Sequence, residues 1–280
     1  MIIRKGKMWD SNDLLTVYQT TRWSEEYTSE EVKEEHRLVG LERWGWLVAE
    51  KGDQVIGEII FRAEPTPQKG LVGVIRSIDV DIRFQKQGVG CELVAEAERI
   101  LKDKSVQRIM VRSPPSAYNF WMKLGYFARG SLTWIEDEID NIPIMRTSSI
   151  STHRLKDFDG LPDTIAFSNL ALADSLAKTV SDVVDKGKVG RVFEFRKEKE
   201  PIGSGVIVKR DAKRAEFVAD VLPRATDFFP VIISRTARAA SGWTTETAFS
   251  VVPEDSLGSF IKSGTWDIQE AHDIPVTKLL

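Results

Sequence analysis

Short apolar blocks of strand length recur through the first half of the chain and alternate with segments of helical period. Apolar runs bounded by polar or glycine-containing turns occupy residues 46–49, 55–61, 71–80 and 108–111. The turn Lys51-Gly52-Asp53-Gln54 joins the first two runs as a hairpin. Residues 1–9 predict one more short strand.

Four segments carry helix signals. Polar capping residues at 10–12 precede apolar residues at helical spacing, and Thr28-Ser29-Glu30-Glu31 fits a capping box. Residues 88–102 are amphipathic, with an apolar face made of Val89, Leu93, Ala97, Ile100 and Leu101. A short helix over 117–123 ends at Gly125, because glycine tolerates the left-handed conformation of helix ends.

Strands and helices alternate, which predicts an α/β or α+β domain around a mixed sheet. Trp134 and Ile135 are expected to begin the last strand of this unit.

The second half repeats the order of these landmarks. The hairpin at Trp46-Leu47-Val48-Ala49 and Val55-Ile56-Gly57 corresponds to Val192-Phe193-Glu194-Phe195 and Pro201-Ile202-Gly203. The helix before Gly125 corresponds to one before Gly264, and Trp121 and Phe260 each lie four residues before the glycine. Two landmark sets in the same order favour a duplication over chance.

We therefore predict two tandem domains, 1–147 and 152–280. The division falls at the hydroxyl-rich segment Thr147-Ser148-Ser149-Ile150-Ser151-Thr152, which carries no strong pattern.

Composition narrows the class of protein. The chain has 280 residues, a formal net charge of −3 and one cysteine, Cys91. The weak charge argues against a nucleic-acid partner, and one cysteine cannot form an internal disulfide. The sequence has no apolar signal segment and no run near the ~20 apolar residues of a membrane helix. A cytoplasmic protein without a membrane partner is expected, and its three histidines lack metal-ligand spacing, so no metal is expected.

The segment from Val80 to Leu93 carries the clearest chemistry. A strand runs into the turn Gln85-Lys86-Gln87-Gly88-Val89-Gly90 and then into a helix. Several backbone N–H groups converge there at the positive end of a helix dipole, which suits a diphosphate. The loop lacks the third glycine of a dinucleotide-binding loop and the Gly-Lys-Ser/Thr of a P-loop.

The remaining pattern, Gln/Arg-x-x-Gly-x-Gly/Ala after a strand, resembles the GNAT superfamily of N-acyltransferases. The helix Ala117-Tyr118-Asn119-Phe120-Trp121-Met122-Lys123-Leu124-Gly125-Tyr126 and the strand at 55–61 are similar to two further segments of that family, in the same order.

The resemblance implies a mixed-sheet fold and binding of acetyl-CoA or another short acyl-CoA as co-substrate. The implied cofactor-binding residues are Val80, Ile82, Gln85, Lys86, Gln87, Gly88, Val89, Gly90 and Trp121. The acceptor is then a small-molecule amine or a peptide amine. An amine attacks the thioester directly, and the amide of Val80 holds the tetrahedral intermediate.

Two positions depart from the family pattern. The family often has a tyrosine that protonates the leaving thiolate where this chain has Trp121, and an asparagine where it has Pro114. An indole is no usable acid at neutral pH. Tyr118 is one helical turn from Trp121 and could reach the sulfur, and Asp79 could serve as the base.

The second copy departs further. Its loop position reads Leu222-Pro223-Arg224-Ala225-Thr226-Asp227-Phe228-Phe229-Pro230, which contains no glycine. A diphosphate cradle is not expected there, so this copy is interpreted as a degenerate domain that shapes the acceptor site. The sequence favours an acyl-CoA-dependent N-acyltransferase; the alternative is a non-catalytic acyl-CoA-binding or interaction module.

Overall fold

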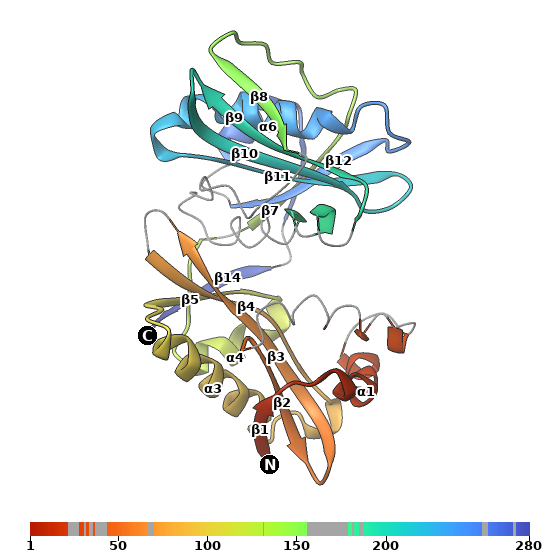
Figure 1. Cartoon of the computed structure of the whole chain (residues 1–280), viewed down its shortest axis with the longest axis vertical. Coiled ribbons are helices and arrows are strands. Elements are labelled where there is room, and N and C mark those ends of the chain that lie inside the picture. Colours follow the sequence, from red (N-terminus) through yellow and green to blue (C-terminus); the bar gives the residue numbers. More distant parts are fainter. Residues whose placement is uncertain are drawn as a thin grey trace.

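A computed structural model describes residues 1–21, 28–30, 32–33, 36, 44–66, 70–130, 132–155, 179–180, 182–184, 187–253, 257–270 and 273–280. These residues form two seven-stranded mixed sheets, one in each half of an elongated molecule (Figure 1). The expected capping box includes Glu31, which lies outside the described residues. In the part of the chain just given, no helix has the length and apolar character needed to cross a membrane.

The first sheet has the strand order β1-β2-β3-β4-β5-β14-β6. Its strands are β1 (Ile2–Lys5), β2 (Trp46–Lys51), β3 (Gln54–Thr66), β4 (Gly70–Val80), β5 (Arg108–Ser113), β6 (Phe127–Ala128) and β14 (Ile274–Leu279). β4 and β5 run parallel, and β2, β3 and β4 form an antiparallel meander. The strands expected from the apolar runs are confirmed.

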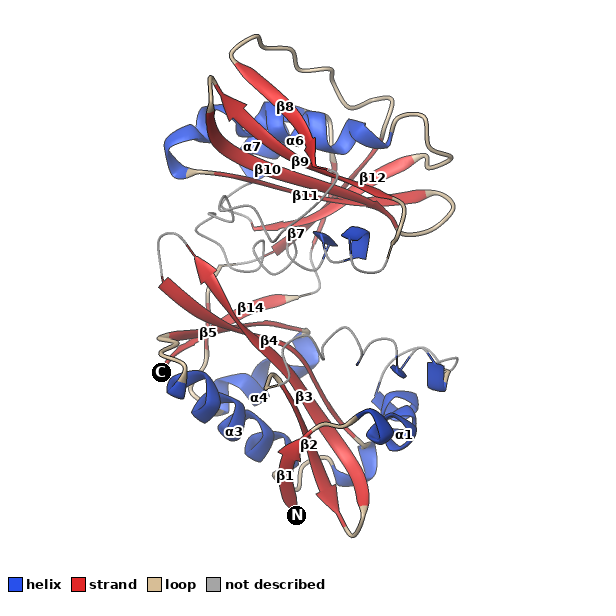
Figure 2. Ribbon diagram, viewed as in Figure 1, coloured by secondary structure: helices blue, strands red, loops and turns tan. Residues whose placement is uncertain are grey.

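Helices cover both faces of this sheet (Figure 2). They are η1 (Met8–Asp10), α1 (Ser11–Thr21), η3 (Ile82–Phe84), α3 (Val89–Asp103), η4 (Pro115–Ala117) and α4 (Tyr118–Lys123). The apolar stripe of α3 packs with α4 on one face, where Leu93, Ala97 and Leu101 are fully buried. α1 packs on the other face through Leu14, Val17 and Tyr18.

The second sheet has the order β13-β7-β12-β11-β10-β9-β8. Its elements are β7 (Leu132–Glu138), β8 (Ile150–Leu155), β9 (Gly190–Lys197), β10 (Glu200–Lys209), β11 (Arg214–Val221), η5 (Pro223–Phe228), α6 (Phe229–Ala237), η6 (Arg238–Ala240), β12 (Thr247–Pro253), α7 (Leu257–Ser263) and β13 (Asp267–Glu270). α6 and α7 pack on one face of it around Phe229 and Phe260.

The duplication expected from the sequence is confirmed by matching positions in the two sheets. Gly57 lies opposite Val80 in the pair β3–β4, and Gly203 lies opposite Val221 in the pair β10–β11. A Cβ on Gly57 would lie 2.8 Å from the carbonyl oxygen of Asp79, and one on Gly203 would lie 2.5 Å from that of Asp220. Both glycines permit the same close backbone approach, so the two copies share a detailed local geometry.

The two sheets cut across the expected division into 1–147 and 152–280. β7, expected to be the last strand of the first unit, pairs with β12 and β13 in the second sheet. β14, from the end of the chain, lies between β5 and β6 in the first sheet. Each copy thus gives one strand to the other. The physical reason is that apolar alternation specifies a strand and its inward face, while the sheet it joins depends on contacts distant in sequence.

A small valine-rich cluster joins the two halves. Val72 of β4 and Met110 of β5 pack against Val192, Val206 and Val218 of the second sheet. Val72 and Met110 lie on the face of the first sheet opposite α3, and α1 covers another part of this same face. The second copy therefore borders the α1 side of the first sheet.

Candidate acyl-CoA site

Two parallel strands separate in the middle of the first sheet. β4 pairs with β5 only from Val72 to Ile75, which face Arg108 to Val111. At that point β4 carries a bulge, because Ile75 faces Phe61 and Ser77 faces Ile60, leaving Arg76 as the extra residue. A bulge bends its strand and strengthens the local twist. The end of β4 thus diverges from β5 and leaves backbone groups facing the gap.

The amide of Val80 is one of those groups. Asp81 N donates to Ile56 O at 2.9 Å, so Asp81 is bonded to β3. In an antiparallel pair successive residues alternate between bonding the partner strand and facing away from it. Val80 therefore faces the β5 side, and its carbonyl accepts a hydrogen bond from Gln85 Nε2 at 2.9 Å.

The turn after β4 is held by its own side chains. Asp81 is fully buried, and its Oδ1 accepts from Arg83 N at 2.9 Å while its Oδ2 pairs with Arg83 Nη2 at 2.6 Å. Hydrogen bonds from Arg83 lower the pKa of the Asp81 carboxyl against the opposing effect of burial. Gln87 Nε2 donates to Arg83 O at 2.9 Å. The side chains of Gln85 and Gln87 thus brace the loop, while Ile82 and Lys86 are exposed on it.

The glycines of this loop have two different roles. Gly88 is the N-cap of α3 with φ of 90°, and a Cβ there would have no atom within 4 Å. Lys86 also has positive φ, 59°. Gly90 lies against α4, because a Cβ there would be 3.3 Å from the ring of Phe120. Gly88 therefore keeps space open at a helix N-terminus, where a diphosphate fits, whereas Gly90 also serves helix packing. Val89, in contrast, is buried in the core.

α4 presents the other expected site residues. Tyr118 is its first residue, half-buried and packed at the edge of the core beneath α3. Trp121 is only 1 % exposed and meets Phe120 and Tyr126 edge-on at 5.0 Å. Phe260 at the matching position of the second copy is 0 % exposed. Trp121 thus packs the core in this structure and offers almost no surface to a ligand.

Asp79 lies on the opposite face from α3. It is half-buried, and its Oδ1 accepts from Thr21 Oγ1 at 3.1 Å. Thr21 is the last residue of α1. Asp79 therefore lies on the α1 side of the sheet, one residue before the Val80 amide.

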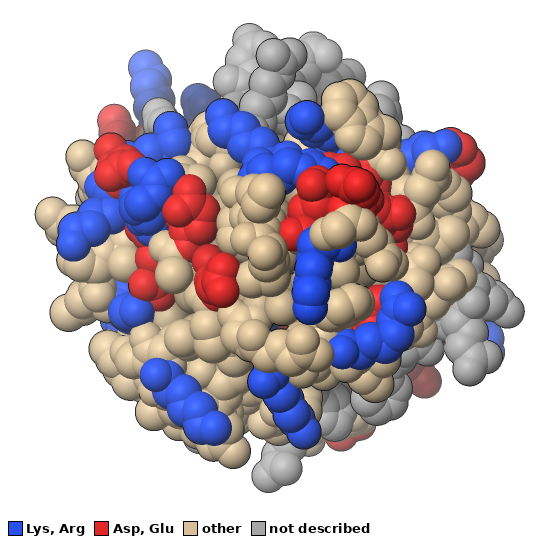
Figure 3. Space-filling model, turned by 90° about the horizontal axis from the view of Figure 1, so that it is seen from below, with Lys and Arg blue, Asp and Glu red and all other residues tan. Residues whose placement is uncertain are grey.

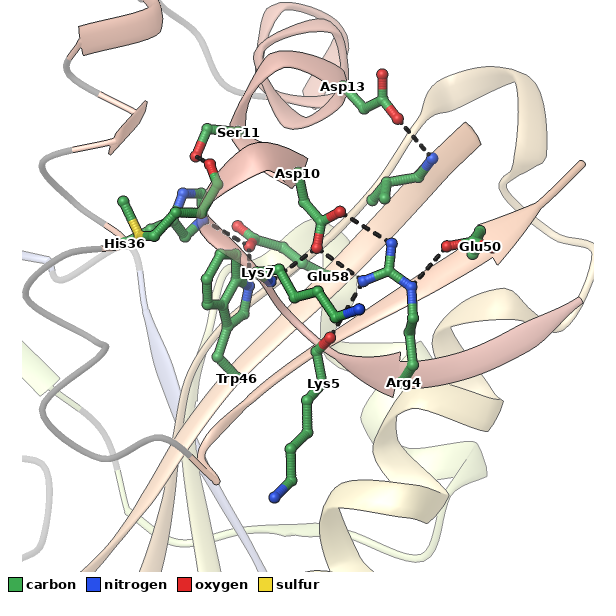
Figure 4. Close-up of polar contacts among 12 residues, drawn as sticks. Arg4, Lys5, Lys7, Asp10, Ser11, Asp13, His36, Trp46, Glu50 and Glu58 are labelled. Carbon is green, nitrogen blue, oxygen red and sulfur yellow. Dashed lines mark hydrogen bonds and ion pairs between the residues drawn. The ribbon is translucent and has the colours of Figure 1, made fainter. Parts of the chain in front are cut away.

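A buried polar cluster on the same face was not expected from the sequence (Figure 4). Glu58 of β3 is fully buried and accepts hydrogen bonds from Tyr18 Oη and from Trp46 Nε1 at 2.9 Å, and its carboxylate lies 2.8 Å from His36 Nε2. The available signal was a single carboxylate inside an apolar run, since Glu58 interrupts residues 55–61.

The loop of the second copy has another structure. η5 replaces the glycine turn, and Phe229 and Pro230 are buried at the start of α6. Pro230 carries no N–H, so the first turn of α6 lacks one of the amides that the first turn of α3 offers. No metal-binding group of three or more His, Cys, Asp or Glu side chains occurs among the residues that the structure describes. Basic and acidic side chains are mixed on the end of the molecule that carries the first sheet (Figure 3).

Comparison with known proteins finds a family match in the first half of the chain. Residues 13–126 match the model of the acetyltransferase (GNAT) family. No curated protein sequence matches the chain significantly.

Solved structures share the fold over nearly the whole chain. A GCN5-related N-acetyltransferase from Kribbella flavida has a TM-score of 0.62 and 14% identity, covering 100% of this chain and 71% of its own. One from Anabaena variabilis has a TM-score of 0.62 and 14% identity, with 99% and 72% covered. A tandem GNAT protein from the clavulanic acid biosynthesis pathway has a TM-score of 0.57 and 11% identity, with 99% and 98% covered.

The matched segment contains the diverging strands and the loop before α3, and the tandem relative aligns with both sheets. The match to this family supports acyl-CoA binding and a general acyl-CoA N-acyltransferase function. The segment 13–126 thus matches the acetyltransferase (GNAT) family, and the chain as a whole has the fold of two tandem GNAT-like domains.

Proposed function

We propose that this protein transfers an acetyl or other short acyl group from acyl-CoA to an amine, in a ternary complex and without a covalent enzyme intermediate. The observation that carries the proposal is the open, glycine-capped N-terminus of α3 beside the diverging ends of β4 and β5. Backbone amides at a helix N-terminus and around a glycine with positive φ suit a diphosphate.

The proposed cofactor contacts follow the loop. The amides from Gln87 to Gly90 and the exposed Lys86 would hold the diphosphate, and the outward amide of Val80 would face the acyl carbonyl. Gln85 supports this arrangement indirectly, through its bond to the Val80 carbonyl. Trp121 is left out of the contact set, because its burial favours a packing role.

The proposed chemistry is direct aminolysis. The amine nitrogen forms a bond to the acyl carbon, the carbonyl oxygen gains negative charge near the Val80 amide, and the C–S bond then breaks. Asp79, directly or through water, takes the proton that the amine loses. Tyr118 gives a proton to the departing thiolate. Positioning supplies much of the rate in such a reaction, since a thiolate leaves readily.

The second copy has a proposed part in acceptor recognition. Its valine cluster contacts the first sheet on the face that carries Asp79, so its surface borders the side from which an amine would approach. Its own loop contains no glycine, and Pro230 removes an amide from the start of α6, which favours one acyl-CoA per chain.

A thiol-release assay with acetyl-CoA and a panel of amines tests the proposal. Amine-dependent release of CoA with formation of the N-acylated product is expected. Tight acyl-CoA binding without turnover of any amine would favour the second candidate, a non-catalytic acyl-CoA-binding module. That candidate is favoured by the packing role of Trp121 and by Pro114, at the positions where the family often has tyrosine and asparagine.

A further inference from the structure

The carboxylate of Glu58 is fully enclosed near the proposed site. It is 0 % exposed, and its two oxygens are hydrogen-bonded to groups on three other segments: Tyr18 of α1, His36, and Trp46 of β2. Taking a carboxylate out of water costs several kcal/mol unless hydrogen bonds replace its hydration. A carboxylate buried at this cost is expected to have a role beyond packing.

Two hydrogen bonds in this cluster have an unambiguous donor. Tyr18 donates to Oε1, and Trp46 donates to Oε2. Nε2 of His36 lies 2.8 Å from Oε2 and 3.2 Å from the Tyr18 hydroxyl. The His36 ring is also stacked on the Trp46 indole, with centroids 4.2 Å apart and planes 10° apart. Glu58 is thus held in one orientation from both sides.

α1 is fixed to the sheet at two successive turns. Tyr18 bonds Glu58, and Thr21, three residues further along the helix, bonds Asp79 at 3.1 Å. Residues three apart lie on the same helix face. Glu58 and Asp79 are themselves direct partners in the ladder between β3 and β4. Two helix side chains therefore meet two neighbouring carboxylates, one buried and one half-buried.

The same end of α1 also reaches the start of the loop. The amide of Ile82 donates to Thr20 Oγ1 at 3.5 Å. The position of α1 is thereby coupled both to Asp79 and to the residue that begins η3 before the glycine turn.

The second copy shows what the fold alone requires. Ser204 lies opposite Asp220 and follows Gly203, as Glu58 lies opposite Asp79 and follows Gly57. Val192 occupies the position of Trp46, since these residues face Val206 and Ile60. The copy without the glycine loop thus keeps the aspartate and lacks both the buried carboxylate and its indole donor. The fold forms without them.

We propose that Glu58 is a positioning residue of the acyl-transfer site. Through Tyr18 it holds α1 in register with β3 and β4, so that Thr21 keeps the Asp79 carboxylate oriented beside the end of β4. This inference rests on the proposed function, in which Asp79 accepts the proton of the amine.

Three variants test it against a purely structural role. Glu58→Gln keeps the shape and removes the charge, and Tyr18→Phe removes the hydroxyl that links Glu58 to α1. Leu14→Ala is the matched control, because Leu14 is fully buried on the same face of α1 and bears no hydrogen-bonding group. Each variant is measured at a temperature where thermal unfolding shows it to be folded.

The inference predicts a split between kinetic parameters. Glu58→Gln and Tyr18→Phe should each lower kcat by about tenfold or more, since small misplacements of reacting groups are costly. The double variant should be little worse than either single one, because the two residues act as a unit. The dissociation constant for acyl-CoA should stay within about twofold in all variants, and Leu14→Ala should keep the wild-type kcat.

Hydrogen exchange gives a readout that does not depend on turnover. Amide exchange in the segment from Asp79 to Arg83 should accelerate in Glu58→Gln and Tyr18→Phe and stay unchanged in Leu14→Ala. Equal exchange and equal kcat in Glu58→Gln and Leu14→Ala would overturn the positioning role. A wild-type chain that acylates no amine would refute the proposed function instead, and the exchange data would still decide whether Glu58 orders Asp79.

Discussion

At the scale of single residues, the proposed site depends on how β4 ends. Val80 faces the gap beside β5, Asp79 faces α1, and Asp81 turns back to hold Arg83. Three consecutive residues at the end of β4 thus have three different roles, because successive residues of a strand face opposite ways and the strand ends at Asp81. The loop that follows inherits its shape from Asp81, because that carboxylate is buried at the point where the strand stops.

This dependence predicts a pH effect. The pKa of Asp81 lies below its usual range because Arg83 hydrogen-bonds the carboxylate. A carboxyl whose pKa is lowered in the folded state stabilises the protein at pH values above its unfolded pKa of about 4. This contribution to the free energy of unfolding is lost as the pH falls through the folded-state pKa. Asp81→Asn should therefore lower the free energy of unfolding at pH 7.

The measurement is chemical denaturation of wild type and Asp81→Asn across a pH series. The difference between them should shrink as the pH drops below the usual range of an aspartate. A difference that stays constant from pH 7 to pH 3 would contradict the assigned ion pair.

Tyr118 gives a second prediction at this scale. If it protonates the departing thiolate, Tyr118→Phe should lower kcat by about 10²-fold or more, the usual size of an acid contribution. The affinity for acyl-CoA, measured by calorimetry, should remain nearly intact. If kcat is unchanged and only the melting temperature moves, Tyr118 is a packing residue at the edge of the α3 core.

At the scale of elements, the sequence predicted which segments are strands and helices better than it predicted where they pack. The apolar runs became β2 to β5, and the amphipathic pattern became α3. The loop before α3 could be recognised because glycine positions report backbone conformation directly, and Gly88 does have φ of 90°.

Other features depend on contacts that no local pattern encodes. The alternation of apolar and polar residues in β7 fits a strand of either sheet. The sequence therefore could not predict that β7 pairs in the sheet of the second copy. Glu58 gathers its donors from residues up to 40 positions away. The family resemblance predicted a site role for Trp121, and only its burial against Tyr126 indicates packing here.

At the scale of the whole molecule, the exchange of β7 and β14 links the two copies, and we expect them to unfold as one cooperative unit. β14 pairs with β5 over its whole length, Thr277 Oγ1 donates to Ile109 O at 2.8 Å, and Lys278 Nζ contacts Glu98 of α3 at 2.8 Å. The sheet proposed to bind acyl-CoA is therefore complete only when the end of the chain is present.

A truncation tests this dependence. Removing residues 274–280 should expose the edge of β5 and the core around Val276, which is fully buried. We expect aggregation or loss of cooperative unfolding in both halves. Light scattering measures the aggregation, and scanning calorimetry measures the unfolding. Lys278→Met is the control, because it removes one ion pair and keeps the strand. A truncated chain that unfolds like wild type would show that β14 is dispensable.

The most direct test of the central claim is a calorimetric titration with CoA of the wild-type chain and two matched variants. Gly88→Glu places bulk and negative charge at the N-terminus of α3, and Thr226→Glu places the same side chain on an exposed residue of η5 in the second copy. We predict one CoA per chain in wild type and in Thr226→Glu, and no measurable binding in folded Gly88→Glu. Two CoA molecules per chain, or unchanged affinity in Gly88→Glu, would contradict the assignment of the site to the first copy.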